Sequence, residues 1–179
     1  MRRRYQFLVL VLAVFWVAAT TFLVKIPASN QIAAPQKGFH APNFTSDSGV
    51  QNQVALSDFE NQVVLLNFWA SWCQPCKTEM PAMERVYQSL KDDGFTILAV
   101  NVTSTDEVGS AQNLIENLGL TFPVLFDYSG SIQTTYKVLA LPTSFFIDRK
   151  GVIQAVIIGG PMPESLIYSK VYELLEKSE

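Results

Sequence analysis

The feature that most constrains the fold is a nearly continuous apolar run in the middle of the chain, Val63-Val64-Leu65-Leu66-Asn67-Phe68. Such a run is typical of a strand that is buried on both faces, as in parallel sheets. Residues 74–92 follow with apolar side chains at spacings of three and four, which predicts a helix. A buried strand that leads directly into an amphipathic helix begins a βαβ unit, so the sequence predicts an α/β fold.

The same alternation continues to the end of the chain. Further strands are predicted at 95–100, 124–126, 143–147 and 152–158, and further helices at about 105–118, 132–138 and 163–177. Thr105 or Asp106 is the expected cap of the first of these helices, and Gly119 is expected to end it. The turn signal Asp148-Arg149-Lys150-Gly151 joins the last two strands into a hairpin. Residues 39–60 alternate weakly around Ser48-Gly49, which predicts a short entry hairpin. This order predicts a mainly parallel central sheet covered by helices, with an antiparallel edge.

The N-terminal segment has a different character. Eighteen residues from Phe7 to Val24 carry no charge, and three arginines at positions 2–4 precede them. A helix of that length measures about 27 Å, close to the thickness of the bilayer core. We interpret residues 1–25 as a cytoplasmic tip and a single-pass transmembrane signal-anchor; a cleaved signal peptide is the alternative. Both interpretations place the remainder on the extracytoplasmic side of the cytoplasmic membrane, periplasmic or outer.

Composition limits the partners of the remaining chain. Residues 26–38 are polar and aperiodic, which predicts a linker to a domain at 39–179. Beyond Lys25 there are nine basic and sixteen acidic residues, a net charge of −7 with the histidine neutral. This charge argues against a nucleic-acid partner, because phosphate contacts need clustered Lys and Arg. Two cysteines and one histidine cannot supply four ligands to a structural zinc ion, so no metal is expected.

The two cysteines, Cys73 and Cys76, stand where the predicted central strand ends and a helix begins. A thiol there faces unpaired backbone N–H groups and the positive end of the helix dipole, which lower its pKa. Cys73 is therefore the predicted nucleophile toward a partner disulfide, and Cys76, one turn later, resolves the mixed disulfide. Pro75 suits the first helical turn because it lacks a backbone donor. A redox-active Cys73–Cys76 disulfide would need no other cofactor.

The segment Asn67-Phe68-Trp69-Ala70-Ser71-Trp72-Cys73-Gln74-Pro75-Cys76-Lys77 resembles the active-site strand and helix start of thioredoxins, most closely those of the exported TlpA/ResA/CcmG (DsbE) branch. Pro81 matches the proline within the thioredoxin active-site helix, and Leu141-Pro142-Thr143 matches the cis-proline loop. Three further stretches resemble the branch's entry hairpin and central insertion: 41–44, 56–59 and 106–126. The resemblance covers 39–179. It implies a thioredoxin fold with an N-terminal hairpin and a central helix–strand insertion, preceded by one transmembrane helix.

The resemblance also implies substrate-binding residues, namely Trp72, Pro75, Leu141 and Pro142. A cis-Pro142 loop beside the reactive cysteine would let the backbone of Leu141 pair with an incoming substrate segment. It would also keep metal ions away from the dithiol. Trp72 is expected to form a wall of the site. Trp69 could do the same or could be core packing.

Proton handling is expected to differ from that of ordinary thioredoxins. Those proteins usually carry a buried Asp six residues before the first cysteine, and this chain has Asn67, which cannot exchange a proton. Glu79 lies three residues after Cys76, on the same helix face. It matches a glutamate proposed for proton management in ResA-like proteins, so it is the expected third catalytic residue. The alternative is a solvated helix glutamate.

By resemblance, the function is that of an extracytoplasmic thiol–disulfide oxidoreductase, a dithiol reductant of disulfides in exported proteins. Apocytochrome c during cytochrome c maturation is an expected substrate. A reductant in an oxidising compartment must be recharged, and the family implies a membrane thiol-electron donor of the CcdA or DsbD type. The alternatives are an oxidising or peroxidase-type redoxin and a binding module with a non-catalytic disulfide. A purely structural role is disfavoured because a four-residue loop gains little from cross-linking.

Overall fold

The computed structural model describes residues 33–47 and 53–177 of the 179-residue chain. The predicted transmembrane segment at 1–25 and the tip of the entry hairpin at 48–52 lie outside the described residues. Among the residues that are described, no helix has the length and apolar content needed to cross a bilayer.

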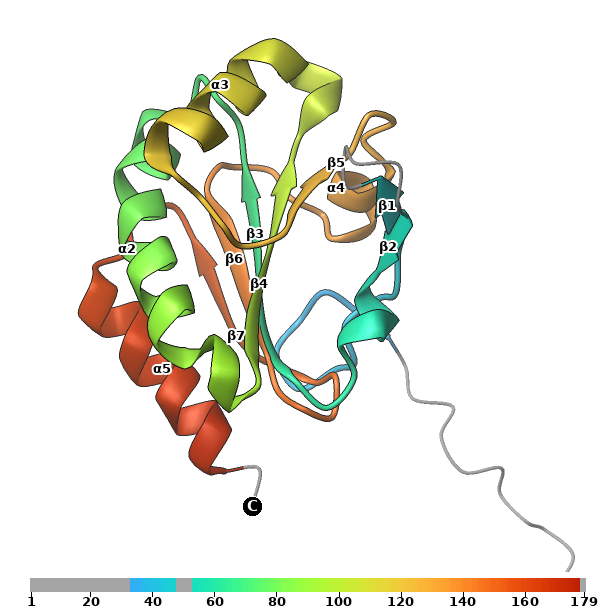
Figure 1. Ribbon diagram of the computed structural model, residues 1–179. Helices are drawn as coiled ribbons and strands as arrows, with labels where there is room; N and C mark the ends of the chain where they lie inside the picture. Colours follow the sequence, from blue (N-terminus) through green and yellow to red (C-terminus); the bar gives the residue numbers. More distant parts are fainter. Residues whose placement is uncertain (1–32, 48–52, 178–179) are drawn as a thin grey trace, which may run out of the picture. The chain divides into compact units, whose positions relative to one another are not determined.

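The elements follow one another in the predicted order (Figure 1). The strands are β1 (Thr45–Asp47), β2 (Gln53–Ala55), β3 (Val63–Trp69), β4 (Phe95–Asn101), β5 (Val124–Phe126), β6 (Thr143–Ile147) and β7 (Ile153–Ile158). The α-helices are α2 (Gln74–Leu90), α3 (Val108–Leu118), α4 (Ser131–Thr135) and α5 (Glu164–Glu176). Short 3-10 helices are η1 (Leu56–Phe59), η2 (Lys91–Asp93) and η3 (Thr103–Thr105).

These strands form one mixed sheet in the order β2-β1-β5-β4-β3-β6-β7. β4 pairs in parallel with both β3 and β5, whereas β6 and β7 are antiparallel to their neighbours. The β1–β2 hairpin joins the opposite edge through an antiparallel pairing with β5. The predictions of a parallel centre, an entry hairpin and an antiparallel edge are therefore confirmed.

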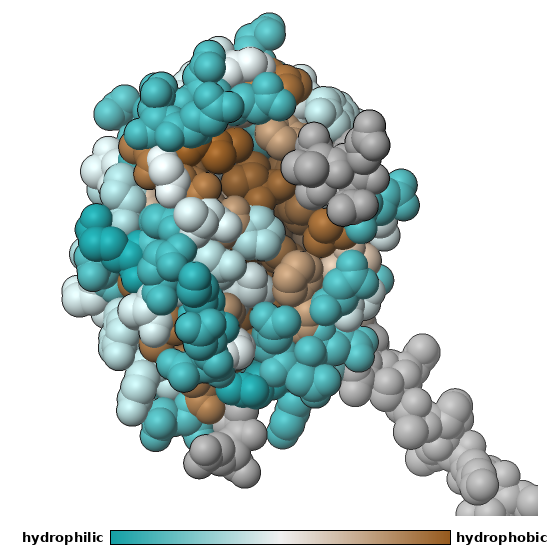
Figure 2. Space-filling model, in the orientation of Figure 1, coloured by the Kyte–Doolittle hydropathy of each residue, from teal (hydrophilic) through white to brown (hydrophobic). Residues whose placement is uncertain are grey.

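The central strand β3 is buried along its whole length, as its composition predicts. Leu65 and Trp69 contribute to a core under α2 and α5, and Leu66 and Phe68 contribute to a second core on the opposite face, which includes residues of α4 and η1. Figure 1 shows α2 and α5 side by side along their face of the sheet. Figure 2 shows apolar side chains reaching the surface below α3. The alternating side chains of β3 thus contribute to both cores.

Two helices differ from their predicted bounds. α3 begins at Val108 with Glu107 as its N-cap, rather than at Thr105 or Asp106, because the Asp106 side chain binds other partners. It ends before Gly119, as predicted, and the left-handed φ of 59° there favours glycine. α4 stops at Thr135, and the backbone reverses at Lys137, which has a φ of 52°.

Part of the predicted linker packs against the domain. The N–H of Gly38 donates to the carbonyl of Ile153 at 2.8 Å, and the N–H of Ile153 donates to the carbonyl of Phe39 at 2.9 Å. The compact unit accordingly starts at Ala33 rather than at residue 39. A polar, aperiodic stretch can still be ordered when its backbone pairs with an exposed strand, and composition does not reveal this.

Tyr136 connects the segment just before β1 to the core. Its buried ring packs against Phe44, Phe68 and Phe145, with centroid distances of 6.0, 5.5 and 5.0 Å. Its hydroxyl donates to the carbonyl of Pro42 at 2.7 Å. The ring therefore supplies packing, and the hydroxyl supplies one long-range hydrogen bond.

We expect Tyr136→Phe to lower the free energy of unfolding by about 1–2 kcal/mol, because one buried hydrogen bond is lost. Tyr136→Ala should lower it by about 3–5 kcal/mol, because the aromatic packing is lost as well. Urea unfolding of the two variants beside the unchanged protein measures both effects. Equal losses in the two variants would contradict the assigned division between ring and hydroxyl.

Candidate active site

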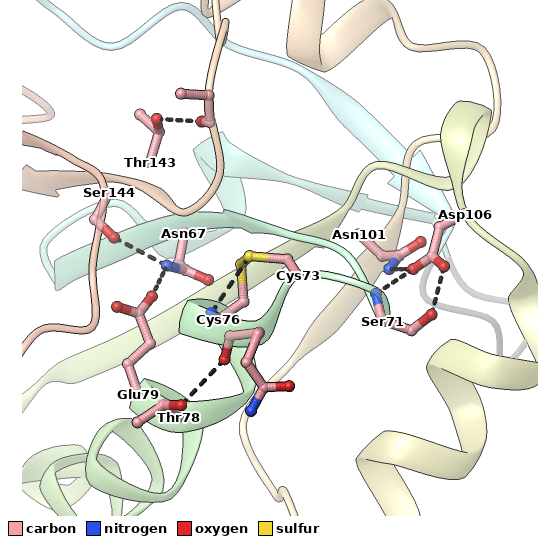
Figure 3. Close-up of a disulfide and its surroundings, with 12 residues drawn as sticks. Asn67, Ser71, Cys73, Cys76, Thr78, Glu79, Asn101, Asp106, Thr143 and Ser144 are labelled. Carbon is pink, nitrogen blue, oxygen red and sulfur yellow. Dashed lines mark hydrogen bonds between the residues drawn. A yellow bond between two sulfur atoms is a disulfide. The ribbon is translucent and has the colours of Figure 1, made fainter.

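The two cysteines meet at the start of α2 (Figure 3). Cys73 is the N-cap, and its Sγ accepts a hydrogen bond from the N–H of Cys76 at 3.3 Å. The residues form a disulfide with their Cα atoms 5.3 Å apart. Cys73 is 4% exposed and Cys76 is completely buried. Cys73 is thus the cysteine nearer the surface, which suits its predicted role as the nucleophile, and Pro75 lies in the first helical turn.

Exposed apolar side chains lie next to Cys73 in the chain and near the cis-proline loop. Trp72 is 59% exposed, and its Nε1–H donates to the carbonyl of Thr105 at 3.0 Å, which orients the ring. Trp69 is fully buried in the core, so the core interpretation of this residue is correct. Leu139, just before the cis-proline loop, is 97% exposed, and Ile158, at the end of β7, is 71% exposed.

The peptide bond between Leu141 and Pro142 is cis, as the resemblance predicts. The carbonyl of Pro142 accepts the N–H of Gly159 at 2.8 Å. A β-carbon at Gly160 would come within 2.7 Å of both Pro142 Cγ and Glu79 Oε2. The missing side chain of Gly160 therefore allows the loop after β7 to lie against both the cis-proline and Glu79.

Glu79 is 1% exposed, so the interpretation as a solvated helix glutamate is wrong. Its Oε1 accepts a hydrogen bond from Asn67 Nδ2 at 2.9 Å, and its Oε2 accepts one from the N–H of Met162 at 3.0 Å. Burial raises the pKa of Glu79 above its ordinary value, and the two hydrogen bonds only partly oppose this rise. Glu79 is thus a buried carboxyl with a raised pKa on the same helix as the two cysteines.

Asp106 holds the loop that leads into the site. It accepts hydrogen bonds from the backbone N–H and the hydroxyl of Ser71, both at 2.5 Å, and from Asn101 Nδ2 at 2.7 Å. Burial raises the pKa of Asp106, but the hydrogen bonds from Ser71, Asn101 and Glu107 outweigh it and hold this pKa below its ordinary value. Asp106 therefore stays ionised and fixes the turn just before Cys73.

Sequence reasoning missed several of these contacts. Asp106 was expected only as a possible helix cap, and Ser144, which accepts a hydrogen bond from Asn67 Nδ2 at 2.9 Å, was not expected at the site. The signal for Ser144 is its position directly opposite Asn67 in the pairing of β3 with β6. That register becomes visible only once the sheet has been assembled.

This geometry permits one reaction in particular. Cys73 can exchange its bond to Cys76 for a bond to a sulfur of another protein, and the reverse exchange restores the disulfide. A dithiol at the start of a helix on a mixed sheet, next to a cis-proline loop, defines a thioredoxin-fold thiol–disulfide oxidoreductase.

Comparison with known proteins agrees with this class. Residues 38–156 match the AhpC/TSA family. The chain is 36% identical to the thiol-disulfide oxidoreductase ResA of Oceanobacillus iheyensis over 162 residues, which cover 88% of this chain and 83% of the relative. It is 40% identical to ResA of Bacillus cereus over 129 residues, which cover 72% and 73% of the two chains.

Solved structures lead to the same family. The crystal structure of a thiol:disulfide interchange protein DsbE from Chlorobium tepidum superposes with a TM-score of 0.72 at 35% identity, covering 78% of this chain and 98% of that one. StoA from Bacillus subtilis superposes with a TM-score of 0.64 at 28% identity, covering 72% and 96%. The chain belongs to the TlpA/ResA/CcmG family of thiol–disulfide oxidoreductases.

The raised pKa of Glu79 makes stability depend on pH. Between 4.5 and the raised pKa, the folded protein holds a proton that the unfolded chain has lost, so stability falls as the pH rises through this window. The glutamine of Glu79→Gln does not titrate. Across this window the unchanged protein should therefore lose unfolding free energy relative to the variant, about 1.4 kcal/mol for each unit by which the folded pKa is raised. Urea unfolding of both proteins over a pH series that starts below 4.5 measures this difference. A difference that stays constant with pH would contradict the assignment.

Proposed function

We propose that this chain is a membrane-anchored dithiol reductant of disulfides in exported proteins. The observation that carries the proposal is the pairing of a nearly buried Cys73 at a helix start with a fully buried Cys76. Cys73 is the cysteine with exposed surface that a partner can reach, and Cys76 is shielded from solvent. Such an arrangement serves repeated exchange rather than lasting cross-linking.

The reaction has two steps. The Cys73 thiolate attacks a substrate disulfide, so one substrate sulfur becomes bonded to Cys73 and the other leaves as a thiolate. Cys76 then loses its proton and attacks Cys73 Sγ, which restores the Cys73–Cys76 disulfide and releases the second substrate thiolate. Two electrons pass to the substrate. Glu79 is the proposed acceptor of the Cys76 proton, because it is the buried carboxyl one helical turn further along α2.

The proposed direction of electron flow rests on the absence, in the described part of the chain, of a cation that would add to the stabilisation of the Cys73 thiolate by backbone N–H groups and the helix dipole. A strong oxidant of this type is one whose reduced form is strongly stabilised. Here the backbone N–H of Cys76 donates to Cys73 Sγ, and no cationic side chain of the described residues forms a hydrogen bond with that sulfur. The dipeptide Gln74-Pro75 between the cysteines also brings no positive charge. Both features favour donation of electrons.

Substrates would dock on the apolar side chains around Cys73. Trp72, Leu139 and Ile158 are exposed, and the cis-Pro142 loop adds the backbone of Leu141 as a pairing edge. This surface suits an extended, unfolded protein segment that carries a disulfide. Apocytochrome c before haem attachment is such a substrate, and we propose it as the physiological one.

The uncharged run from Phe7 to Val24 supports an extracytoplasmic position at the cytoplasmic membrane. A reductant in that compartment needs electrons from the cytoplasm. A membrane thiol-electron donor of the CcdA or DsbD type would supply them by reducing the Cys73–Cys76 disulfide. Anchoring would hold the domain close to such a donor.

The alternatives lack comparable support. A peroxidase-type redoxin would need a cysteine in the context Pro-x-x-x-Thr-x-x-Cys, and the chain has two cysteines, both in the Cys-x-x-Cys pair. A binding module with an inert disulfide would not require a buried carboxyl beside the resolving cysteine. Turnover of a disulfide substrate separates the oxidoreductase from the binding module.

Substrate trapping tests the proposed role. In full-length protein expressed in cells, Cys76→Ser should leave Cys73 in mixed disulfides that are released by a reductant, and these complexes should collect in the membrane fraction. Recovery of a c-type apocytochrome is the expected result. A broad set of exported proteins would count against a role in cytochrome c maturation, and soluble complexes would count against the anchor. The matched control is the Cys73→Ser and Cys76→Ser double variant, which should trap nothing.

A second measurement tests Glu79. The ionised carboxylate disfavours a nearby thiolate, so Glu79→Gln should lower the pKa of Cys76 by roughly one unit. The resolution of the mixed disulfide should nevertheless slow, because the proton acceptor is lost. Thiol titration of the reduced protein and the release rate of a chromogenic substrate report the two quantities. Unchanged pH profiles of both cysteines would remove Glu79 from the mechanism.

A further inference from the structure

Asn67 is a fully buried polar residue within the apolar strand β3. Alternation along β3 places it on the face of Leu65 and Trp69, and both belong to the core cluster that contains Cys76. Its amide nitrogen has two hydrogens, and both are used. One is donated to Glu79 Oε1 and the other to Ser144 Oγ, each at 2.9 Å.

These two partners fix the orientation of the amide. An ionised Glu79 carboxylate can only accept hydrogen bonds, so it requires the nitrogen of Asn67 on its side rather than the oxygen. The oxygen Oδ1 must then point away from Glu79 and Ser144. Among the described residues, none donates a hydrogen bond to this oxygen, although it is buried. A buried carbonyl without a partner is unfavourable and calls for an explanation.

The disulfide lies on the side where this oxygen is free. Figure 3 shows Asn67 between Glu79 and the Cys73–Cys76 bond, with its oxygen directed toward the cysteines. Neither sulfur of a disulfide carries a hydrogen, so the oxidised site offers the oxygen no donor. A reduced Cys76 does carry one, because a thiol is a weak hydrogen-bond donor. Cys76 is also fully buried, so solvent does not compete for its proton.

We propose that Asn67 is a positioning residue for the reduced site, where its Oδ1 accepts a hydrogen bond from the Cys76 thiol while its amide nitrogen keeps its bonds to Glu79 and Ser144. A donor dithiol delivers two electrons and two protons, the S–S bond of the chain breaks, and the donor leaves as a disulfide. One proton remains on Cys76 and is held by Asn67. The other belongs to Cys73, which releases it to solvent on becoming a thiolate.

Two consequences follow for the chemistry of Cys76. A hydrogen bond to the neutral thiol disfavours the thiolate, so Asn67 raises the pKa of Cys76. The acceptor is paired in the dithiol and unpaired in the disulfide, so Asn67 also shifts the equilibrium toward the dithiol. Of the two hydrogen-bond partners of Asn67, Glu79 is ionisable and Ser144 from β6 is neutral. The further partner of Glu79, the Met162 N–H from the loop after β7, is also neutral. Asn67 thus stabilises the reduced, dithiol form of the protein until a substrate arrives.

Redox equilibrium with glutathione tests this role on the purified full-length protein. Asn67→Leu, which is similar in size but has no acceptor, should shift the equilibrium constant toward the disulfide by about three- to tenfold, up to about 30 mV in potential. The pKa of Cys76 should fall in the same variant. Ser144→Ala removes a partner of the amide nitrogen but leaves the oxygen, so it should change both quantities much less. Equal effects of the two variants would overturn the proposal.

A double-mutant cycle separates direct contact from action through Glu79. The shift caused by Asn67→Leu should persist when it is measured in a Glu79→Ala background. Its disappearance there would show that Asn67 acts only by holding Glu79, and would overturn the proposal. The assay reads the site itself and not the substrate or the location, so an error in the proposed function would not affect it.

Asn67→Asp provides an independent check if Asn67→Leu does not fold. In acid, where the introduced carboxyl is neutral, its carbonyl oxygen can still accept from Cys76, so the glutathione equilibrium should match that of the unchanged protein. At higher pH the new carboxylate should raise the pKa of Cys76 further. An acid-range equilibrium shifted toward the disulfide by about three- to tenfold relative to the unchanged protein would contradict the proposal.

Discussion

Burial of β3 on both faces is the constraint on which the rest of the structure depends. Its neighbours β4 and β6 satisfy its backbone, and its alternating side chains fill the cores on the two sides of the sheet. Because a shift by one residue would place each set of side chains in the other core, the register and end point of the strand are fixed. That end point determines where α2 begins, and therefore where Cys73 meets the unpaired N–H groups of the first turn. The reactivity of the thiol is in this sense a consequence of how the sheet packs.

The polar cluster beneath the cysteines is an exception within this apolar frame. Burying Glu79 is unfavourable, as its raised pKa indicates, and the hydrogen bonds from Asn67 and Met162 only partly offset the loss of water. The close approach at Gly160 adds to the burial by bringing the loop after β7 onto the carboxylate. A protein selected for stability alone would fill this space with apolar side chains. Retaining a carboxyl here makes sense if the site must move a proton out of reach of solvent.

Much of the fold could be predicted from local patterns. The apolar run of β3, the helical spacing of α2 and the turn at Asp148-Arg149-Lys150-Gly151 are each encoded by neighbouring residues, and the structure has all three. Cys73 and Cys76 could be identified from the sequence for the same reason. What remained hidden depends on contacts between distant residues. Ser144 reaches Asn67 only through strand register, Asp106 fixes Ser71 across 35 positions of sequence, and the burial of Glu79 requires a loop more than 80 residues later. Spacing on a helix could suggest that Glu79 faces Cys76, but not that it is shielded from water.

Exchanging the strand carboxylate of ordinary thioredoxins for an amide separates two tasks that a single Asp would combine. An aspartate at position 67 could both accept the proton of the resolving thiol and, when neutral, hydrogen-bond to it. With Asn67 the strand can only hold the proton, so an acceptor must come from elsewhere, and we propose Glu79 on the helix, which accepts a hydrogen bond from Asn67. The two side chains share one hydrogen bond, so the charge on Glu79 constrains which way the amide of Asn67 faces. Under this proposal, proton release from Cys76 is linked to the state of a carboxyl that the loop after β7 covers, next to the cis-proline.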